Sequence, residues 1–153
     1  MQKIPPARRA YARAMRIGIV GTRHAVCIDR DESVEAVSCA MRIERVDEVV
    51  VTERQSDARI PIGIVSARDI VTRVVALGLD SSVVTAGDLL WTLPAQARIT
   101  DSVPEALQRL CGTGAESLPI VDSDGKLMGV VSLDDLLQAL AGSESSRPDR
   151  FHR

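Results

Sequence analysis

The chain repeats itself once along its length, and this duplication limits the possible folds more than any other feature of the sequence. Three segments recur with the same order of apolar and polar residues. The first two recur 70 residues further along the chain, and the third recurs 66 residues further. The matched segments are 35–37 with 105–107, 50–52 with 120–122, and 63–71 with 129–137. We therefore expect a fold built from two copies of one supersecondary unit.

The offset between the copies falls by four residues at one place. The segment 53–60 of the first copy, ERQSDARI, is longer than the turn 123–126 of the second, and both separate two predicted strands. A one-residue slip is also needed near Ile28 and Ile99. Because a duplicated fold tolerates length changes that are confined to turns, the copies are treated as equivalent outside these points.

Each copy predicts the order strand, helix, strand, strand, helix. The first helix of each copy has apolar residues three and four positions apart, which is the spacing of one helix face. Asp31 or Ser33 can cap the helix of the first copy, and Asp101 or Ser102 can cap that of the second. The other predicted elements are extended segments at 25–28 and 97–99, strands at 49–51, 61–65, 118–121 and 127–131, and closing helices at 67–77 and 133–140, each stopped by a glycine.

Composition and repeat together predict a mixed α/β (α+β) fold. Apolar residues make up 45% of the chain but aromatic residues only 2%, so the core must be aliphatic. A copy of about 60 residues buries too little surface to stand alone, so two β-α-β-β-α repeats should pack sheet to sheet as one pseudo-twofold module. The expected parts are a basic helical extension over 1–16, repeat 1 over 17–80, repeat 2 over 81–142, opened by a short helix at 84–90, and a flexible tail over 143–153.

Charge and cysteine content argue against several classes of protein. A net charge of −2 is not that of a general nucleic-acid binder, which would be strongly basic. Three scattered cysteines with no paired spacing make zinc binding unlikely; they are expected in or near the core of a cytoplasmic protein without a signal peptide. No apolar run approaches the roughly 20 residues of a membrane span.

One short element occurs at the same place in both copies. A glycine is followed by two apolar residues, a serine, two further residues and an aspartate, where the second strand turns into the closing helix. Ser66 and Asp69 belong to the first element, and Ser132 and Asp135 to the second. Such a pair can be a capping box, in which serine and acid satisfy free backbone N–H groups. It can also serve a ligand, because free N–H groups at a helix start suit a phosphate and an aspartate can accept ribose hydroxyls.

The order of elements, the segment Leu118-Pro119-Ile120-Val121-Asp122 and the duplicated Gly-x-x-Ser-x-x-Asp element resemble a tandem CBS-domain pair, or Bateman module, over about residues 17–141. The resemblance implies two clefts between the paired sheets, which in this family often hold AMP, ADP, ATP or S-adenosylmethionine. It implies that the aspartates hold the ribose and the serines face ribose or phosphate. Backbone groups of the second strand would frame the adenine, with apolar contact from the closing helix. On this pattern the ligand-binding residues are Ser66, Asp69, Ile70 and Val50 in the first copy and Ser132, Asp135, Leu136 and Ile120 in the second.

The residue before each aspartate breaks the symmetry of the two copies. It is Arg68 in the first copy and Asp134 in the second. The basic residues that often meet phosphates before the second strand in this family are replaced by Val46-Asp47 and Glu116-Ser117. Because an acidic group near a phosphate is repulsive, the cleft with Arg68 should be the better phosphate site. The cleft with Asp134 should prefer an uncharged or cationic adenosyl compound or stay empty.

Two classes of function remain open at this point. The first is a regulatory sensor, for example of cellular energy state, that binds an adenosyl ligand and catalyses nothing. The sequence shows no Ser/His/Asp set, metal cluster or phosphate loop with lysine. The second is a module that binds no ligand and acts only by homodimerisation or by regulating a separate partner protein. The resemblance implies a homodimer in either case.

Overall fold

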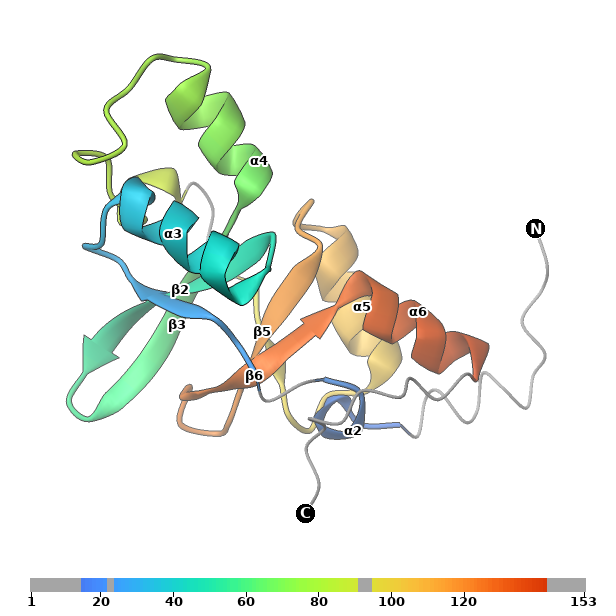
Figure 1. The fold of residues 1–153 in the computed structure, drawn as a ribbon. Coiled ribbons are helices and arrows are strands. Elements are labelled where there is room, and N and C mark those ends of the chain that lie inside the picture. Colours follow the sequence, from blue (N-terminus) through green and yellow to red (C-terminus); the bar gives the residue numbers. More distant parts are fainter. Residues whose placement is uncertain (1–14, 22–23, 91–94, 143–153) are drawn as a thin grey trace. The chain divides into compact units, whose positions relative to one another are not determined.

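The structure is a computed structural model that describes residues 15–21, 24–90 and 95–142. Two compact units form, and each contains one three-stranded sheet. The first-repeat unit is the continuous segment Ala25–Pro94, and the second-repeat unit combines Met1–His24 with Ala95–Arg153. In each unit, helices lie against one side of the sheet (Figure 1). The predicted mixed α/β class is confirmed.

In the first-repeat unit the elements follow the predicted order. The central strand is β2, with β1 parallel to it on one side and β3 antiparallel on the other. The closing helix leaves the α-helical pattern after one turn and continues as a wider π-helical turn. The elements are β1 (Cys27–Asp29), α3 (Val34–Glu44), β2 (Glu48–Gln55), β3 (Ala58–Ser66), α4 (Ala67–Ile70), the π-helical turn (Val71–Val75) and a 3₁₀ helix (Gly87–Leu89).

The second-repeat unit has the same topology. Its central strand is β5, paired in parallel with β4 and antiparallel with β6. The closing helix is here α-helical throughout, and it ends at Gly142, which adopts the left-handed conformation that favours glycine. The elements are α2 (Ile17–Val20), β4 (Ala97–Arg98), α5 (Val103–Cys111), β5 (Ser117–Val121), β6 (Leu127–Ser132) and α6 (Leu133–Ala141).

An aliphatic core holds each unit together. Val34 and Val37 of α3 are fully buried and face Val49 and Val51 of β2. Val34 and Val37 lie on one face of the helix because they are three residues apart. Ser33 caps the first turn of α3, accepting a hydrogen bond from the Ala36 amide at 3.2 Å. The corresponding core of the second-repeat unit includes Val103, Ala106, Leu110, Leu118, Ile120 and Val131.

The hairpin of the first repeat is longer than predicted. The predicted strands were 49–51 and 61–65, but β2 continues to Gln55 and β3 begins at Ala58, leaving only Ser56 and Asp57 in the turn. The predicted hairpin forms, and its strands extend through polar residues outside the apolar pattern that marked the strands in the sequence. A two-stranded ribbon can leave both of its faces in water, so polar residues do not exclude it.

Strand pairing corrects the alignment of the two repeats. Val49 lies opposite Val65 in the first unit, and Leu118 lies opposite Val131 in the second. Val49 and Leu118 are therefore equivalent, and the offset between the central strands is 69 residues rather than 70. As a consequence, the residue equivalent to Ile120 is Val51, not Val50.

The first helices give the same offset of 69. Ser33 caps α3 and Ser102 caps α5. Ile28 and Ala97 hold equivalent places in the parallel strands, so the predicted slip near Ile28 is not needed. The identical letters Glu35 and Glu105 misled the alignment, since they lie at different positions of the first helical turn.

Two short segments, 15–21 and 84–90, precede the first strand of repeat 1 and of repeat 2, respectively, and we call them the leaders. The first leader packs in the second-repeat unit, where Ile17 is fully buried. Its backbone is fixed by hydrogen bonds from the Ile17 amide to the Asp101 carbonyl at 2.9 Å and from the Gly18 amide to the Ile99 carbonyl at 3.2 Å. A segment that precedes repeat 1 in the sequence therefore completes the core of repeat 2.

The second leader makes the corresponding contacts in the first-repeat unit. The Ala86 amide donates to the Glu32 carbonyl at 2.8 Å, and the Gly87 amide donates to the Arg30 carbonyl at 2.9 Å. The predicted short helix forms here as the 3₁₀ helix, but it packs on the first repeat instead of opening the second unit. The boundaries 17–80 and 81–142 thus remain a prediction about the repeats in the sequence.

Some expectations concern single residues or the chain ends. Cys27 is half-buried, whereas Cys39 and Cys111 are exposed, so the expectation of three core cysteines is wrong for two of them. The predicted basic helix over 1–16, apart from Met15 and Arg16, and the tail over 143–153 lie outside the described residues. None of the helices within the described ranges is long and apolar enough to cross a membrane.

Candidate functional site

The junction of β3 and α4 holds the first predicted pair. The Asp69 carboxylate accepts hydrogen bonds from the Ser66 amide and the Ser66 hydroxyl, both at 2.8 Å. In return, the Asp69 amide donates to the Ser66 hydroxyl oxygen at 3.1 Å. This is a complete capping box, with both side chains half-buried at the end of β3, the second strand of the hairpin.

The junction of β6 and α6 repeats this arrangement. The Ser132 amide donates to the Asp135 carboxylate at 3.0 Å, and the Asp135 amide donates to the Ser132 hydroxyl oxygen at 3.1 Å. The two pairs differ in exposure, because Asp135 is only 4% exposed. The equivalent Asp69 is the more accessible of the two carboxylates.

A third capping box lies at the start of α5. The Ser102 amide and hydroxyl both donate to the Glu105 carboxylate at 2.8 Å. These hydrogen bonds lower the pKa of Glu105 below its ordinary value. The sequence analysis gave Ser102 as a possible cap but missed Glu105 as its partner. This box is not part of the duplicated element, so it offers a control for capping without a predicted ligand.

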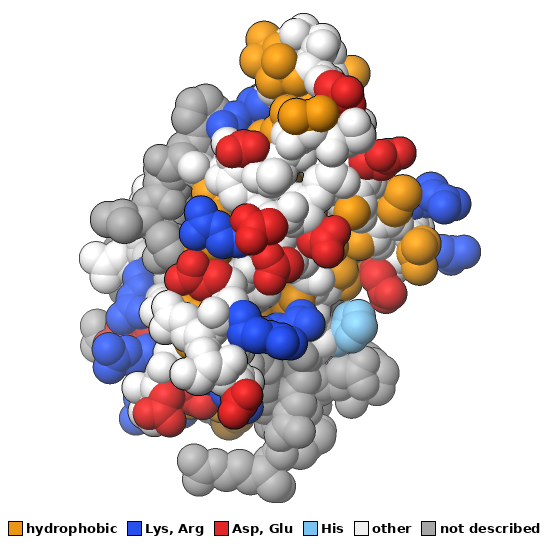
Figure 2. Space-filling model, turned by 90° about the vertical axis from the view of Figure 1, so that its left-hand side faces the viewer, with side chains coloured by type: hydrophobic (Ala, Val, Ile, Leu, Met, Phe, Trp, Pro, Cys, Tyr) orange, Lys and Arg blue, Asp and Glu red, His pale blue; other side chains and the backbone are white. Residues whose placement is uncertain are grey.

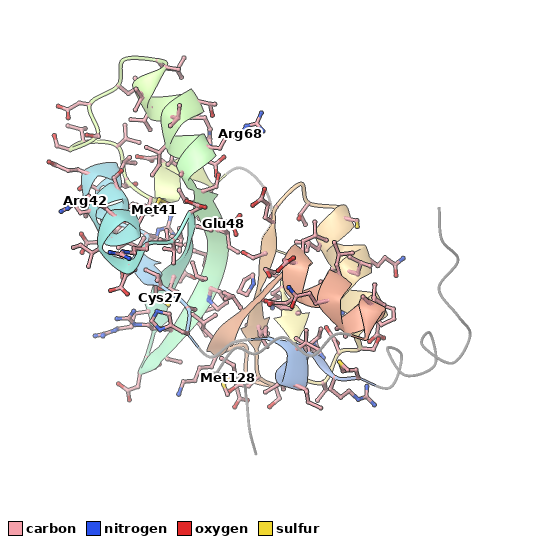
Figure 3. All side chains as sticks on the ribbon, turned by 45° about the vertical axis from the view of Figure 1, so that its right-hand side comes forward. Cys27, Met41, Arg42, Glu48, Arg68 and Met128 are labelled. Carbon is pink, nitrogen blue, oxygen red and sulfur yellow. The ribbon has the colours of Figure 1, made fainter. Side chains whose placement is uncertain are left out.

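The residues before the two aspartates are both exposed. Arg68 projects away from α4 (Figure 3). Asp134 accepts a hydrogen bond from the Gln138 side-chain amide at 2.7 Å. At one junction the residue before the aspartate is therefore an exposed cation, and at the other it is a second anion.

The predicted apolar and backbone contacts are occupied by the protein itself. Ile70 and Leu136 belong to the cores of their units. The Val50 amide donates to the Val26 carbonyl at 2.8 Å. Val50 is not the structural equivalent of Ile120, so the two cannot frame a ligand in the same way. Their assignment as ligand contacts stays a prediction, as does that of the serines and aspartates.

Arg73 is a residue that the sequence analysis missed. It lies in the π-helical turn, one turn after Asp69, and its guanidinium donates to the Leu89 carbonyl of the second leader. Burial lowers the pKa of Arg73, and the nearby Asp69 carboxylate opposes that shift. Nothing in the local sequence around Arg73 indicated that its side chain would bind a backbone carbonyl of the leader.

Other chemistry has little support in the parts of the chain that the structure describes. Those residues contain no group of three or more His, Cys, Asp and Glu side chains placed to hold a metal ion. Burial raises the pKa of the Cys27 thiol, although the neighbouring Arg59 opposes the shift. Because the thiolate is the reactive form, this cysteine is a poor nucleophile.

Comparison with known proteins gives the class to which this fold belongs. The family model of the CBS domain matches residues 18–76 and again residues 86–142. The chain therefore belongs to the CBS-domain family, and it carries a tandem CBS pair, which is a regulatory type of module.

Two related sequences extend this finding. "Uncharacterized protein MK0525" of Methanopyrus kandleri is 31% identical over 126 residues, covering 82% of this chain and 63% of that protein. The chain thus spans less than two thirds of this relative's length. The "Uncharacterized 17.7 kDa protein in bps2 3'region" of Acidianus ambivalens is 27% identical over 128 residues, covering 83% of this chain and 74% of that protein.

Solved structures share the fold. The CBS domain protein PAE2072 from Pyrobaculum aerophilum, complexed with AMP, is 27% identical with a TM-score of 0.72, covering 84% of this chain and all of that one. The CBS domain of a bacterial CNNM/CorC family Mg²⁺ transporter, in complex with ATP, is 18% identical with a TM-score of 0.75, covering 90% of this chain and 95% of that one. The second likeness concerns the fold alone.

Proposed function

We propose that the chain is a non-catalytic regulatory module that binds an adenosyl ligand, with AMP, ADP, ATP and S-adenosylmethionine as the candidates. Family membership supports the proposal, as does the AMP held by the Pyrobaculum aerophilum protein. The regulated target is a separate protein or a further part of a longer chain. A response to both AMP and ATP would make the module a sensor of energy state.

The observation that carries this proposal is the duplicated serine–aspartate junction. Both copies lie where a hairpin strand enters the closing helix of a CBS repeat. In the first copy the carboxylate of Asp69 is half-buried, and the preceding residue, Arg68, is exposed and projects away from α4. A carboxylate that accepts ribose hydroxyls and a cation that meets phosphate are the groups that a nucleotide requires. We therefore place the principal site at Ser66–Asp69 and a weaker one at Ser132–Asp135.

A second candidate function is dimerisation without ligand binding. The hydrogen bonds within the boxes favour it, because a carboxylate that already caps a helix has fewer free acceptor positions for a ribose. Exposed apolar side chains on the closing helices favour self-association: Val71 is 57% exposed and Leu137 is 50% exposed. Binding and dimerisation are compatible, so the experiment has to test binding directly.

The test is thermal unfolding of the full chain with AMP, ATP and S-adenosylmethionine at millimolar concentration. A ligand at 100 times its Kd stabilises the folded protein by about 2.7 kcal/mol. Asp69→Ala should abolish the response to AMP while lowering the unliganded stability by about 1 kcal/mol, the usual cost of a lost cap. Glu105→Ala is the matched control, since it also breaks a capping box but should keep the full response.

The outcomes separate the two candidates. An AMP response that is lost in Asp69→Ala and kept in Glu105→Ala supports the ribose assignment. An AMP response that survives in Asp69→Ala would show that the ligand binds elsewhere. Absence of any shift with all three compounds would leave the boxes as helix caps and favour the dimerisation module.

A further inference from the structure

The closing helices of the two repeats differ directly after the predicted ribose aspartate. In the second-repeat unit, α6 stays α-helical and Ala139, four residues after Asp135, is buried in the core. In the first-repeat unit, the residue four positions after Asp69 is Arg73, and the helix widens there into a π-helical turn. Short π-helical turns often accompany functional sites. The structure thus puts a cation at a position that faces the core in the other repeat.

Arg73 is held between the helix and the second leader. Its guanidinium donates to the Leu89 carbonyl, and the Asp69 carboxylate is close enough to act on its charge. A partly buried cation is stable only where hydrogen-bond acceptors or counter-charges surround it. Arg73 therefore contacts the leader through a hydrogen bond and interacts with the carboxylate at the junction through its charge.

Leu90, the leader residue after Leu89, packs directly against β3, the strand that leads to the junction. Leu90 lies against Gly63 of β3 so closely that a Cβ at this glycine would come within 2.5 Å of the Leu90 Cδ2 atom. Gly63 is three residues before Ser66 on the same strand. The position of the leader and that of the junction are thus coupled by two contacts, one polar and one apolar.

From this arrangement we infer that Arg73 is a positioning residue that ties the second leader to Asp69, so that ligand binding at the junction changes the stability of the leader. The inference rests on the proposed function. A ligand that takes the Asp69 carboxylate as its ribose partner changes the electrostatic environment of Arg73, one helical turn away. The leader precedes repeat 2 in the sequence, so occupancy of the first site alters the segment that leads into the second repeat.

Hydrogen–deuterium exchange of the full chain tests the inference. The Leu89 and Leu90 amides donate to Ala86 and Gly87 carbonyls, both at 3.2 Å, so their exchange reports on the leader. Arg73→Met keeps the length of the side chain and removes its charge, and it should speed exchange of both amides by at least about tenfold, as expected for loss of a hydrogen bond from a charged group. Arg42→Met, a change at an exposed arginine of α3, should leave the exchange rates of the Leu89 and Leu90 amides unaltered.

Ligand coupling is read in the same experiment with AMP and ATP. In the wild-type chain, either compound should protect the Ser66–Asp69 junction and also change exchange at Leu89 and Leu90. In Arg73→Met the junction should still be protected, but the leader should no longer respond. Arg73→Lys keeps the charge without the planar donor group, so its leader should exchange at an intermediate rate. If Arg73→Met does not fold, the lysine variant decides the question.

The results that overturn the inference differ from those that overturn the proposed function. If, without ligand, the Leu89 and Leu90 amides exchange in both Arg73 variants at the wild-type rate, Arg73 does not hold the leader in place. An equal ligand response of the leader in the wild type and in the Arg73 variants would reject the coupling. If calorimetry shows that neither AMP nor ATP binds the wild-type chain, the proposed function and the coupling are both rejected. Exchange measured without ligand would still show whether Arg73 holds the leader in place.

Discussion

Single residues distinguish two junctions that share one backbone design. Each has a serine and an aspartate in the same hydrogen-bonded box, yet the neighbouring side chain is a cation in one and an anion in the other. Both neighbours are exposed, so solvent screens their charges, and an exposed charge pair contributes about 0.2–1 kcal/mol. The difference is large enough to bias ligand choice but too small to determine the fold.

We therefore expect Arg68→Gln to weaken ATP binding by about two- to fivefold, the factor that corresponds to an exposed charge pair. Binding of adenosine, which carries no phosphate, should change little. Isothermal titration of both compounds measures the two effects. Asp134→Asn serves as the comparison at the other junction and should improve ATP binding there by a similar factor. Equal weakening of ATP and adenosine by Arg68→Gln would mean that Arg68 does not meet the phosphates.

At the scale of single residues, the sequence predicted the contacts that form between residues close together in the chain. The serine–aspartate pairs were recognisable because a capping box depends on residues three positions apart. Arg73 was not, since its partner, Leu89, is 16 residues away and contributes a backbone carbonyl that any residue would provide. Glu105 was not recognised as the partner of Ser102 because it was aligned with Glu35, which lies at a different position of the first helical turn.

The elements with the most unusual placement are the leaders. Each is a short segment whose backbone amides bind carbonyls of the repeat that it does not precede. They fit through a glycine in each unit: Leu90 fills the space over Gly63, whereas in the other unit Gly21 lies against the Ile120 side chain. In each contact, a large side chain packs against a glycine, which has no side chain.

This packing predicts a compensating pair of substitutions. Gly63→Ala should lower the melting temperature, because the new methyl group overlaps the Leu90 side chain. Overpacking of this kind typically costs about 1–3 kcal/mol. In a Leu90→Ala background the same change should cost much less, and a double-mutant cycle of melting temperatures measures the coupling. Additive effects of the two changes would show that Leu90 does not rest on Gly63 in solution.

Element order followed from the repeat, but element limits and register did not. The apolar faces of α3 and α5 were predicted from residue spacing, and the closing helices from the repeated serine–aspartate element and the glycine that follows each helix. The length of the β2–β3 hairpin was not, because an exposed ribbon and a loop have the same polar composition. Register depends on which residues pair across strands, and only the pairing of Val49 with Val65 and of Leu118 with Val131 revealed the offset of 69.

At the level of the whole molecule, the two units leave the same kind of surface uncovered. The closing helices expose apolar side chains at corresponding places, Val71 in the first-repeat unit and Leu137 in the second. The turn that follows α4 exposes others, and Figure 2 shows hydrophobic side chains gathered at the top of the molecule, where Figure 1 places this turn. Exposed apolar surface of this extent favours association with another protein, and here the proposed partner is a second copy.

Sedimentation equilibrium should therefore give twice the chain mass of 16.5 kDa. Leu137→Glu should shift the equilibrium towards monomer by at least about tenfold, since a charge buried in an interface without a partner is strongly unfavourable. Ile43→Glu is the control, because Ile43 is 67% exposed but belongs to α3 rather than to a closing helix. A wild-type monomer, or equal effects of the two changes, would contradict dimerisation through this surface.

Because each leader packs on the repeat that it does not precede, the leaders also determine where the chain can be divided into two halves. A fragment that begins at residue 81 would keep its sheet and the helices α5 and α6, but it would lose α2 and with it Ile17, a fully buried residue of its core. A fragment that ends at residue 80 would lose Ala86 and Leu89 in the same way. A segment covering 25–94 retains every described contact of its unit, so a gene cut at the edges of the leaders, rather than between the repeats, is the natural way to obtain one half alone.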